Sequence, residues 1–243
     1  MTSQPIIISI DGNIGSGKST IVEYLKNNIY KINNRNLKIY FLEEPVSVWE
    51  SIIDKNDGKN IIEKFYENNE KYAFTFQMIA YISRLSKLKK IINNNYDIII
   101  TERSIFTDRN VFAKMLYDNK SINEIEYIAY NKWFDEFSEI VDSIKYIYIK
   151  TTPEVSKNRV DHRSRKGEAI SLDYLKKCHE YHEKWLNTIN FNSILIIDGN
   201  LDNNYTNQLI VMERIYNFIS YLIKYNDMLK YRNAFTNCHN NLL

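Results

Sequence analysis

The chain has 243 residues, of which 44% are hydrophobic and 26% are charged, and its formal net charge is +2. This length and composition are ordinary for a soluble globular domain, and the weak net charge argues against a nucleic-acid polymer as a partner. No run approaches the roughly 18 consecutive apolar residues of a membrane-spanning helix. Because the first strand starts within a few residues of Met1, we expect no cleaved signal. The two cysteines, Cys178 and Cys238, match no metal or redox spacing, so we expect a cytoplasmic protein without membrane association.

Five short apolar runs have the character of buried strands: Ile6–Ile10, Lys38–Leu42, Asp97–Thr101, Lys145–Lys150 and Ile194–Asp198. Helix-like stretches separate these runs, which predicts an α/β fold whose parallel sheet is covered by helices on both faces. The chain has only three prolines and six glycines, and no linker divides it, so residues 1–243 are expected to form a single domain. A helix is expected over Asn204–Asn233, packed on its own domain, followed by a frayed polar tail over Ala234–Leu243.

The segment that follows the first strand matches the phosphate-binding loop pattern G-x-x-x-x-G-K-[ST] in full. Its residues are Gly12, Asn13, Ile14, Gly15, Ser16, Gly17, Lys18 and Ser19, and Thr20 continues into a helix. Glycines let backbone N–H groups curl around anionic oxygens, and the helix N-terminus adds partial positive charge. Lys18 would reach the outer phosphates, and the Ser19 hydroxyl would hold Mg²⁺. A simple glycine turn needs neither side chain, so the motif predicts a nucleoside triphosphate site.

Charged side chains follow the second and third strands, where the sites of open parallel sheets form. Glu43 and Glu44 come after the second strand, and Glu102, Arg103 and Asp108 come after the third. Each acid taken alone is more often a solvated loop residue. Together they offer the base, the metal ligand and the cation that phosphoryl transfer to a hydroxyl group requires. We therefore expect a phosphoryl acceptor at this edge of the sheet.

The stretch from Lys59 to Asn95 contains no glycine or proline and has helical periodicity. At about 100° per residue, Tyr66, Gln77 and Arg84 fall on nearly one face. The amide of Gln77 can read the hydrogen-bonding edge of a base, and a neighbouring aromatic side chain such as Phe76 can stack on it. Spacing alone favours the simpler interpretation, which is a helix with an aromatic core face and polar residues on its surface.

Taken together, these blocks resemble the deoxynucleoside kinase family. The resemblance spans about residues 5–200 and rests on the phosphate loop and on further blocks with matching spacing: Glu44-Pro45-Val46 with Trp49, Phe74–Gln77 with Ser83-Arg84, Glu102–Ser104, Asp108-Arg109 with Phe112, and Arg159, Arg163 and Arg165. It implies a P-loop kinase fold with a five-stranded parallel sheet, helices on both faces and a short arginine-rich lid. It also implies ATP as co-substrate, Mg²⁺, and a homodimer.

The resemblance implies catalytic roles by position. Glu44 would contact the 5′-hydroxyl as general base, or Glu102 would take that role; otherwise Glu102 helps to hold Mg²⁺ through water. Arg103 would hold Glu44 and, with Lys18, neutralise charge on the transferring phosphoryl group. The lid would close over the phosphates with three arginines, which on their own have the pattern of a solvated basic face: Arg159, Arg163 and Arg165.

Substrate-binding roles follow in the same way. The base would be paired by Gln77 and enclosed by aromatic side chains, namely Trp49, Phe76 and Phe112. Tyr66 and Glu168 would grip the sugar 3′-hydroxyl, although this chain is one residue shorter than the family pattern between Arg165 and Leu172.

Arg84 and Asp108 are the two residues that indicate which base the protein prefers. Family members that prefer deoxycytidine or purine deoxynucleosides resemble this pair, whereas thymidine-preferring and broad-range relatives have apolar or small residues there. An Arg–Asp pair fills the space of the thymine methyl group and offers a donor and an acceptor to a base edge. We therefore expect deoxycytidine, deoxyadenosine or deoxyguanosine to be preferred over thymidine, without an order among the three.

Three alternatives stay open at this point. A nucleoside monophosphate kinase such as thymidylate kinase shares the fold and the loop, but a carboxylate at Glu44 would repel an acceptor phosphate. A broad-range or thymidine-active deoxynucleoside kinase would keep the reaction and change the preference. A nucleotide-binding module without catalysis has no need for the whole set of Lys18, Ser19, Glu44, Glu102 and Arg103.

Overall fold

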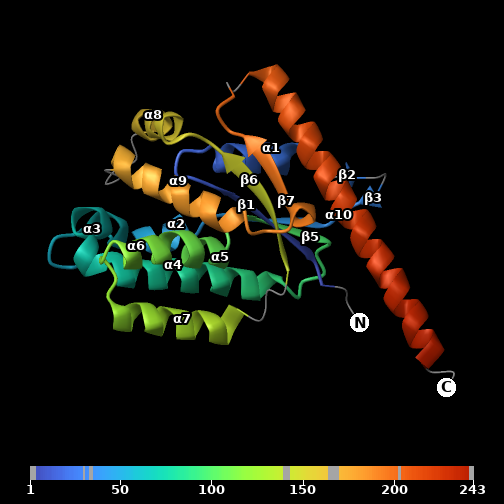
Figure 1. Ribbon diagram of the computed structural model, residues 1–243, viewed down its shortest axis with the longest axis horizontal. Helices are drawn as coiled ribbons and strands as arrows, with labels where there is room; N and C mark the ends of the chain where they lie inside the picture. Colours follow the sequence, from blue (N-terminus) through green and yellow to red (C-terminus); the bar gives the residue numbers. More distant parts are fainter. Residues whose placement is uncertain are drawn as a thin grey trace.

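The computed structural model of the protein describes residues 4–29, 31–32, 35–138, 143–163, 170–201 and 204–240. Its centre is a sheet of five parallel strands in the order β4-β5-β1-β6-β7 (Figure 1). The strands are β1 (Ile6–Gly12), β4 (Ile39–Leu42), β5 (Ile98–Glu102), β6 (Ile144–Lys150) and β7 (Ile194–Asp198). Each lies on one of the five runs expected from the sequence, so the parallel α/β class is confirmed.

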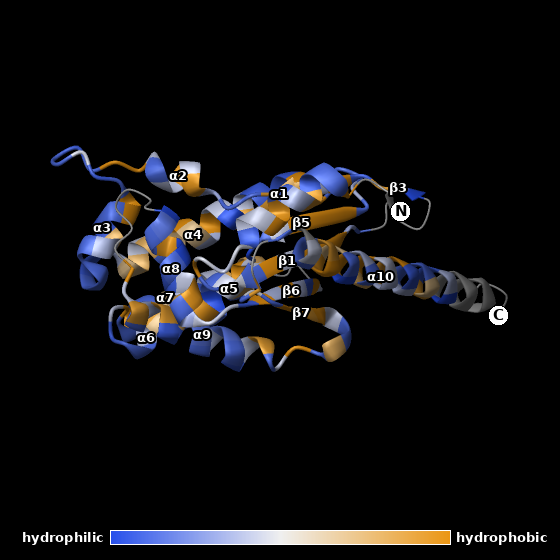
Figure 2. Cartoon of the chain, turned by 90° about the horizontal axis from the view of Figure 1, so that it is seen from above, coloured by the Kyte–Doolittle hydropathy of each residue, from blue (hydrophilic) through white to orange (hydrophobic). Residues whose placement is uncertain are grey.

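Continuous isoleucine runs form two of the central strands, because both faces of the sheet are covered by helices. Ile7 of β1 lies opposite Ile99 of β5, and Ile8 lies opposite Ile100. The first pair belongs to the core on one face of the sheet, and the second pair belongs to the core on the other face. Figure 2 shows these strands as apolar segments enclosed between helices.

Long helices form the layers on the two faces. One face is covered by α1 (Lys18–Asn28) and α10 (Tyr205–Asn240). The other is covered by α4 (Asn69–Ile91) and α9 (Leu172–Leu186), and α7 (Glu124–Ser138) packs against α4. Further helices connect these elements: α2 (Val46–Glu50), α3 (Ile61–Glu67), α5 (Ile105–Thr107), α6 (Lys114–Asp118), α8 (Pro153–Arg163) and the 3₁₀ turn η2 (Phe191–Ser193).

Two local features were not expected from the sequence. The segment Asp108–Ala113 forms a π-helix, η1, between α5 and α6. A hairpin of β2 (Lys31–Ile32) and β3 (Arg35–Asn36) follows α1, and Arg35 Nη1 lies 2.7 Å from Asp227 Oδ2 on α10. Widened π turns are frequent at functional sites, and η1 carries two of the expected site residues.

The helical stretch expected over Lys59–Asn95 is two helices, α3 and α4, rather than one. The chain turns at Asn68, which has φ −147° and ψ 85°, and the Asn68 side chain accepts a hydrogen bond from the Lys71 amide at 3.0 Å. Asparagine favours such capping positions over helix interiors because its side chain competes for backbone groups. Tyr66 therefore lies on a different helix from Gln77, and the single-face argument is wrong for it.

The helix expected over Asn204–Asn233 is present but longer. It continues to Asn240, through most of the segment that was expected to be frayed. Ile215 and Ile219 are fully buried in the core beneath it, in agreement with a helix packed on its own domain. None of the helices in the described part of the chain is long and apolar enough to cross a membrane.

Candidate active site

A cavity of about 1160 Å³ opens where the strands end. Its wall contains most of the residues expected at the site: Ile14, Gly15, Ser16, Gly17, Lys18, Ser19, Thr20, Glu44, Trp49, Tyr66, Phe76, Gln77, Arg84, Glu102, Arg103, Asp108, Phe112, Arg159 and Arg163. Gly12 and Asn13, the first two residues of the loop, are buried and are not part of the wall. Arg165 and Glu168 lie outside the described residues. Segments far apart in the sequence thus meet in one cavity.

The phosphate-binding loop joins β1 to α1 and depends on its glycines. Gly12, Gly15 and Gly17 have φ angles of 151°, 77° and 97°. A Cβ atom on Gly12 would lie 2.6 Å from the Ile149 carbonyl oxygen, and one on Gly15 would lie 2.5 Å from the Ser156 carbonyl oxygen. These two positions have no room for a side chain, whereas Gly17 requires glycine for its left-handed backbone alone. The loop therefore takes its shape from close packing on β6 and α8.

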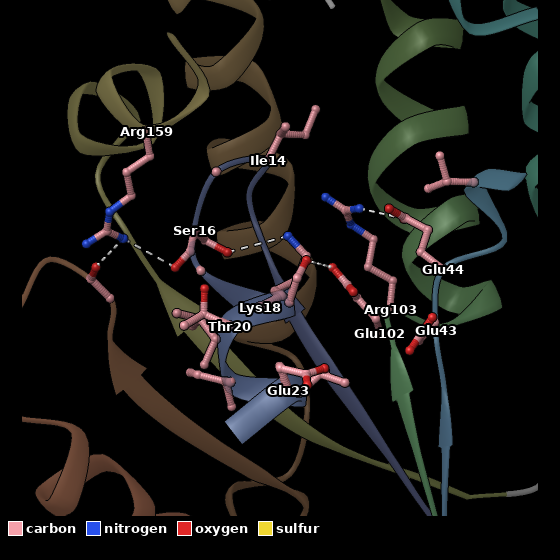
Figure 3. A pocket seen from close by; sticks show the side chains of 18 of the residues that line it. Ile14, Ser16, Lys18, Thr20, Glu23, Glu43, Glu44, Glu102, Arg103 and Arg159 are labelled. Atoms are coloured by element: carbon pink, nitrogen blue, oxygen red, sulfur yellow. Dashed lines mark hydrogen bonds and ion pairs between the residues drawn. The ribbon is translucent and has the colours of Figure 1, made fainter. Parts of the chain in front are cut away.

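Lys18 begins α1, and its ammonium group lies inside the loop. Its Nζ donates to the Asn13 carbonyl oxygen at 2.7 Å. It also lies 3.5 Å from Ser16 Oγ (Figure 3). Burial lowers the pKa of Lys18 to about 7, and repulsion from Arg103 contributes. An anion bound in the loop would favour the charged form. The loop is therefore suited to phosphate oxygens.

Two oxygen groups lie together at the start of α1. The Ser19 hydroxyl donates to Glu102 Oε1 at 2.8 Å, and Glu102 comes from the end of β5. Hydroxyl and carboxylate oxygens are the ligands that Mg²⁺ takes together with nucleotide phosphates. These two residues fit a magnesium ion that is shared between the protein and a bound nucleotide.

Glu44 follows β4 and is held by two arginines. Its Oε1 accepts a hydrogen bond from Arg103 Nη1 at 2.7 Å (Figure 3). The same oxygen accepts a second hydrogen bond from Arg84 Nη2 at 3.2 Å. Burial opposes ionisation, but attraction to Arg103, Arg84 and Lys18 outweighs it and lowers the pKa of Glu44 to about 2. Glu44 is therefore a carboxylate at neutral pH. It can accept a hydrogen bond from a hydroxyl group, and it repels an anion.

Arg103 has a left-handed backbone, with φ 60°. This conformation costs a residue with a side chain about 1–3 kcal/mol and persists only where the surroundings enforce it. The Arg103 amide donates to the Ile10 carbonyl oxygen at 3.0 Å, and its guanidinium carbon lies 5.1 Å from the centre of the Phe112 ring. These contacts direct the side chain into the cavity, toward Glu44.

Arg84 on α4 and Asp108 on η1 form a buried ion pair. Arg84 Nε donates to Asp108 Oδ2 at 2.9 Å, and the two side chains are only 4% and 3% exposed. Arg84 Nη1 also donates to the Glu102 carbonyl oxygen at 2.6 Å. Burial opposes its charge, but Asp108 and Glu44 together raise the pKa of Arg84. One cationic guanidinium thus joins Glu44 to Asp108.

One part of the cavity wall, formed by α2 and α4, is aromatic. The rings of Trp49 and Phe76 meet edge to face at 5.4 Å, and Trp49 Nε1 donates to Ser83 Oγ at 3.0 Å. Gln77 is buried beside them, and its Oε1 has no hydrogen-bond partner among the described residues. A buried acceptor without a partner costs about 1–3 kcal/mol, so a ligand that donates to it binds favourably. A flat ring with an N–H group on its edge fits this part of the cavity.

Arginines of α8 lie next to the phosphate loop. Arg159 Nη1 donates to the Gly199 carbonyl oxygen at 2.8 Å and to the Ser16 carbonyl oxygen at 3.4 Å (Figure 3). Arg163 also lines the cavity. These two residues are the described members of the expected arginine lid.

Two buried residues close to the site were missed by the sequence analysis. Asp11 precedes the phosphate loop inside β1 and is fully buried. A carboxylate within a largely apolar strand was a usable signal for it. His182 on α9 lies behind Phe112, with ring centroids 6.3 Å apart. No local pattern distinguishes His182 from an ordinary core histidine.

Stability is expected to fall on acidification because of His182. Burial lowers the pKa of this imidazole to about 3, whereas an unfolded histidine titrates near about 6.5. Between these values the unfolded chain binds a proton that the folded chain does not. The contribution of His182 is therefore complete above about pH 6.5 and is lost toward pH 3, by up to about 1.4 kcal/mol per pH unit.

Urea unfolding between about pH 7.5 and 4.5 measures this effect. We expect the free energy of unfolding to fall less steeply with acidification in His182→Gln than in the wild type. The exposed His162 provides a matched control, and His162→Gln should keep the wild-type slope. Equal slopes in all three proteins would contradict the assignment.

The sheet, the phosphate loop and the arginine-held carboxylate place the protein among the P-loop kinases. The family model described as deoxynucleoside kinase matches residues 8–220. A fowlpox virus protein named "Probable deoxycytidine kinase" is 34% identical over 226 residues, which cover 88% of each chain. Deoxycytidine kinase of Mus musculus is 34% identical over 200 residues, which cover 74% of each chain. Mitochondrial deoxyguanosine kinase of Xenopus laevis is 31% identical over 198 residues, covering 74% of this chain and 72% of the relative.

The chain therefore belongs to the deoxynucleoside kinase family and is a kinase. The match includes the phosphate loop, the Glu44 segment and the turn that carries Arg103.

Proposed function

We propose that the protein transfers the terminal phosphoryl group of ATP to the 5′-hydroxyl of a deoxynucleoside, giving ADP and the deoxynucleoside 5′-monophosphate in nucleotide salvage. The observation that carries this proposal is Glu44, an ionised carboxylate between Arg103 and Arg84 in the same cavity as the phosphate loop. A carboxylate can take the proton of a hydroxyl group, and it repels an acceptor that already has a phosphate. A neutral nucleoside suits this position.

The cations around the cavity support the transfer step. Lys18 and Arg159 lie on the loop side, and Arg103 lies on the acceptor side. They would meet the charge that spreads over the oxygens of the transferring group. We propose that Ser19 and Glu102 hold Mg²⁺, because their hydroxyl and carboxylate oxygens already share a hydrogen bond at the start of α1. When bound, this ion neutralises developing charge on the phosphates.

The acceptor base is proposed to lie at the aromatic part of the cavity wall, with Gln77 on its edge. Cytosine, adenine, guanine and thymine can each offer an N–H group to Gln77, so that contact does not select among them. We assign the preference to Arg84 and Asp108, whose buried pair occupies space that a thymine methyl group would need. Deoxycytidine or a purine deoxynucleoside is therefore the proposed substrate. Tyr66, which lines the same cavity, is proposed to contact the sugar.

The deciding experiment measures ADP formation from ATP and Mg²⁺ with deoxycytidine, deoxyadenosine, deoxyguanosine, thymidine or thymidine monophosphate. We expect turnover of at least one of the first three and weaker turnover of thymidine. Strong thymidine turnover would keep the reaction and reject the preference. Turnover of the monophosphate alone would favour a nucleoside monophosphate kinase. Binding of ATP without its consumption would favour a module without catalysis.

We also propose a homodimer that forms through the outer faces of α4 and α7. In Figure 1, α7 lies on the outside of α4, away from the sheet. Large apolar side chains of these two helices are exposed: Ile82, Ile125, Ile128 and Trp133. An exposed apolar patch of this kind marks an interaction surface. Light scattering of the wild type should therefore give the mass of two chains.

A charge in this patch is expected to separate the two chains. Trp133→Glu places a carboxylate in the proposed interface, where its desolvation opposes association. The control is Phe191→Glu, because Phe191 is 80% exposed on η2, outside the patch. We expect monomers for the first variant and wild-type mass for the second. A monomeric wild type would reject the interface.

We propose that the enzyme forms one domain over residues 1–243 and acts in the cytoplasm. Its described cysteine, Cys178, is a buried free thiol, as expected for a protein of a reducing compartment. Fractionation of cells that produce the tagged protein tests this location.

A further inference from the structure

A buried hydrogen-bond network lies directly behind the phosphate loop. Its centre is Asp11, which belongs to β1, has no exposed surface and is not part of the cavity wall. One carboxylate oxygen of Asp11 accepts from Ser9 Oγ at 2.5 Å, and the other accepts from the Thr107 hydroxyl. Burying a carboxylate is costly unless its oxygens are well bonded. Both oxygens are bonded here, so the network fixes a specific arrangement.

The network continues into the turn that carries Arg103. The Thr107 hydroxyl donates a hydrogen bond to Asp11 and accepts one from the Ser104 amide at 3.1 Å. The Ser104 hydroxyl accepts one from the Thr107 amide at 3.3 Å. The Ser104 amide belongs to the peptide bond that follows Arg103. Asp11 therefore orients the Thr107 hydroxyl, which in turn binds this peptide bond.

We propose that Asp11 is a positioning residue for phosphoryl transfer, acting through Thr107 and Ser104 to hold Arg103 in its left-handed conformation. The left-handed backbone needs enforcement from its surroundings, and β1 supplies it at two adjacent residues. The Ile10 carbonyl oxygen binds the Arg103 amide at 3.0 Å, and Asp11 binds Thr107. The same strand ends in the phosphate loop. One strand therefore sets the position of the donor-side loop relative to the acceptor-side arginine.

This inference rests on the proposed role of Arg103 and is tested by two buried threonines. Thr107→Val removes the hydroxyl between Asp11 and Ser104 and keeps the shape of the side chain. Thr101→Val is the matched control, because Thr101 is buried and its hydroxyl has no hydrogen-bond partner within the described residues. Thr107→Ser restores the hydroxyl and tests for rescue. Thermal unfolding of each variant verifies that the assayed protein is folded.

We expect Thr107→Val to lower kcat by about 10- to 100-fold, because a displaced Arg103 stabilises the transition state less well. The KM values for ATP and for the deoxynucleoside should stay within about threefold, which a general loss of structure would not produce. Thr107→Ser should recover most of kcat, and Thr101→Val should stay within about twofold of the wild type. A kcat for Thr107→Val equal to that of Thr101→Val would overturn the proposal.

A double-mutant cycle tests whether Asp11 acts through Thr107. Asp11→Asn alone is expected to lower kcat, and the combination with Thr107→Val should be no slower than the slower single variant, since both remove one contact. Effects that multiply would mean that the two residues act independently, and the proposal would be wrong. A wild type that consumes no ATP with any deoxynucleoside would instead reject the proposed function, and with it any kinetic role of Asp11.

Discussion

Replacing Glu44 by glutamine is expected to lower kcat for phosphoryl transfer by about 10²- to 10⁴-fold. The amide keeps the size of the side chain and can still accept a hydrogen bond from Arg103, but it cannot take the proton of the acceptor hydroxyl. It also leaves Arg84 and Arg103 with one negative partner fewer in a buried site. Because the pKa of Glu44 is about 2, the carboxylate is ionised throughout the range about pH 5 to 8. The size of the loss should therefore not change across that range.

The neighbouring acid provides the control. Glu43→Gln makes the same chemical change at a side chain that is 63% exposed and paired with Lys26, and its kcat should stay within about twofold of the wild type. Glu102→Gln should act differently, raising the Mg²⁺ concentration needed for half-maximal activity, since Glu102 shares a hydrogen bond with Ser19. Near-normal kcat in Glu44→Gln together with an inactive Glu102→Gln would assign the base role to Glu102.

Replacing Arg84 by methionine and Asp108 by alanine in one chain is expected to raise kcat/KM for thymidine relative to deoxycytidine by about 100-fold. The double change opens apolar space for the thymine methyl group and removes a buried pair that thymine leaves partly unpaired. A mismatch of this kind costs about 1–3 kcal/mol per group, or about 5- to 150-fold in preference. Absolute turnover should fall for both substrates, because Arg84 also holds Glu44 at 3.2 Å.

Arg84 and Asp108 must be changed together, because a single substitution also affects the stability of the protein. Asp108→Ala alone leaves the buried Arg84 without its closest anion, which is expected to destabilise the protein by about 3–5 kcal/mol. The control is Asp135→Ala, because Asp135 pairs with Arg109 at the surface, where its side chain is 65% exposed. It should leave both stability and preference near those of the wild type. A double variant without a relative gain for thymidine would show that Arg84 and Asp108 do not select the base.

Sequence patterns that fit only one local structure could be predicted from the sequence. The spacing from Gly12 to Ser19 fits a phosphate loop and little else, and the short isoleucine runs can only be buried strands once helical stretches separate them. The structure places both as expected. Which polar residues meet at the strand ends also followed, because parallel strands deliver their ends to one edge.

Contacts between distant segments could not be predicted in this way. Tyr66 reaches the cavity from α3 because the chain turns at Asn68, not because it shares a helical face with Gln77. Asp11 and Thr107 bond across 96 positions of sequence. Periodicity and motif spacing contain no information on such a pair, and for Tyr66 the periodicity indicated the right residue through a single helix that the structure does not contain.

The packing of α10 has a consequence for the growing chain. Ile215 and Ile219 of α10 complete the core that contains Ile8 and Ile10 of β1. A ribosome makes β1 and α1 long before α10, so the part of this core that α10 covers stays open until nearly all of the described chain has been synthesised. Pairing between such distant segments also slows folding. We therefore expect protection from aggregation during translation, as well as the stability of the finished fold, to influence the yield of active enzyme.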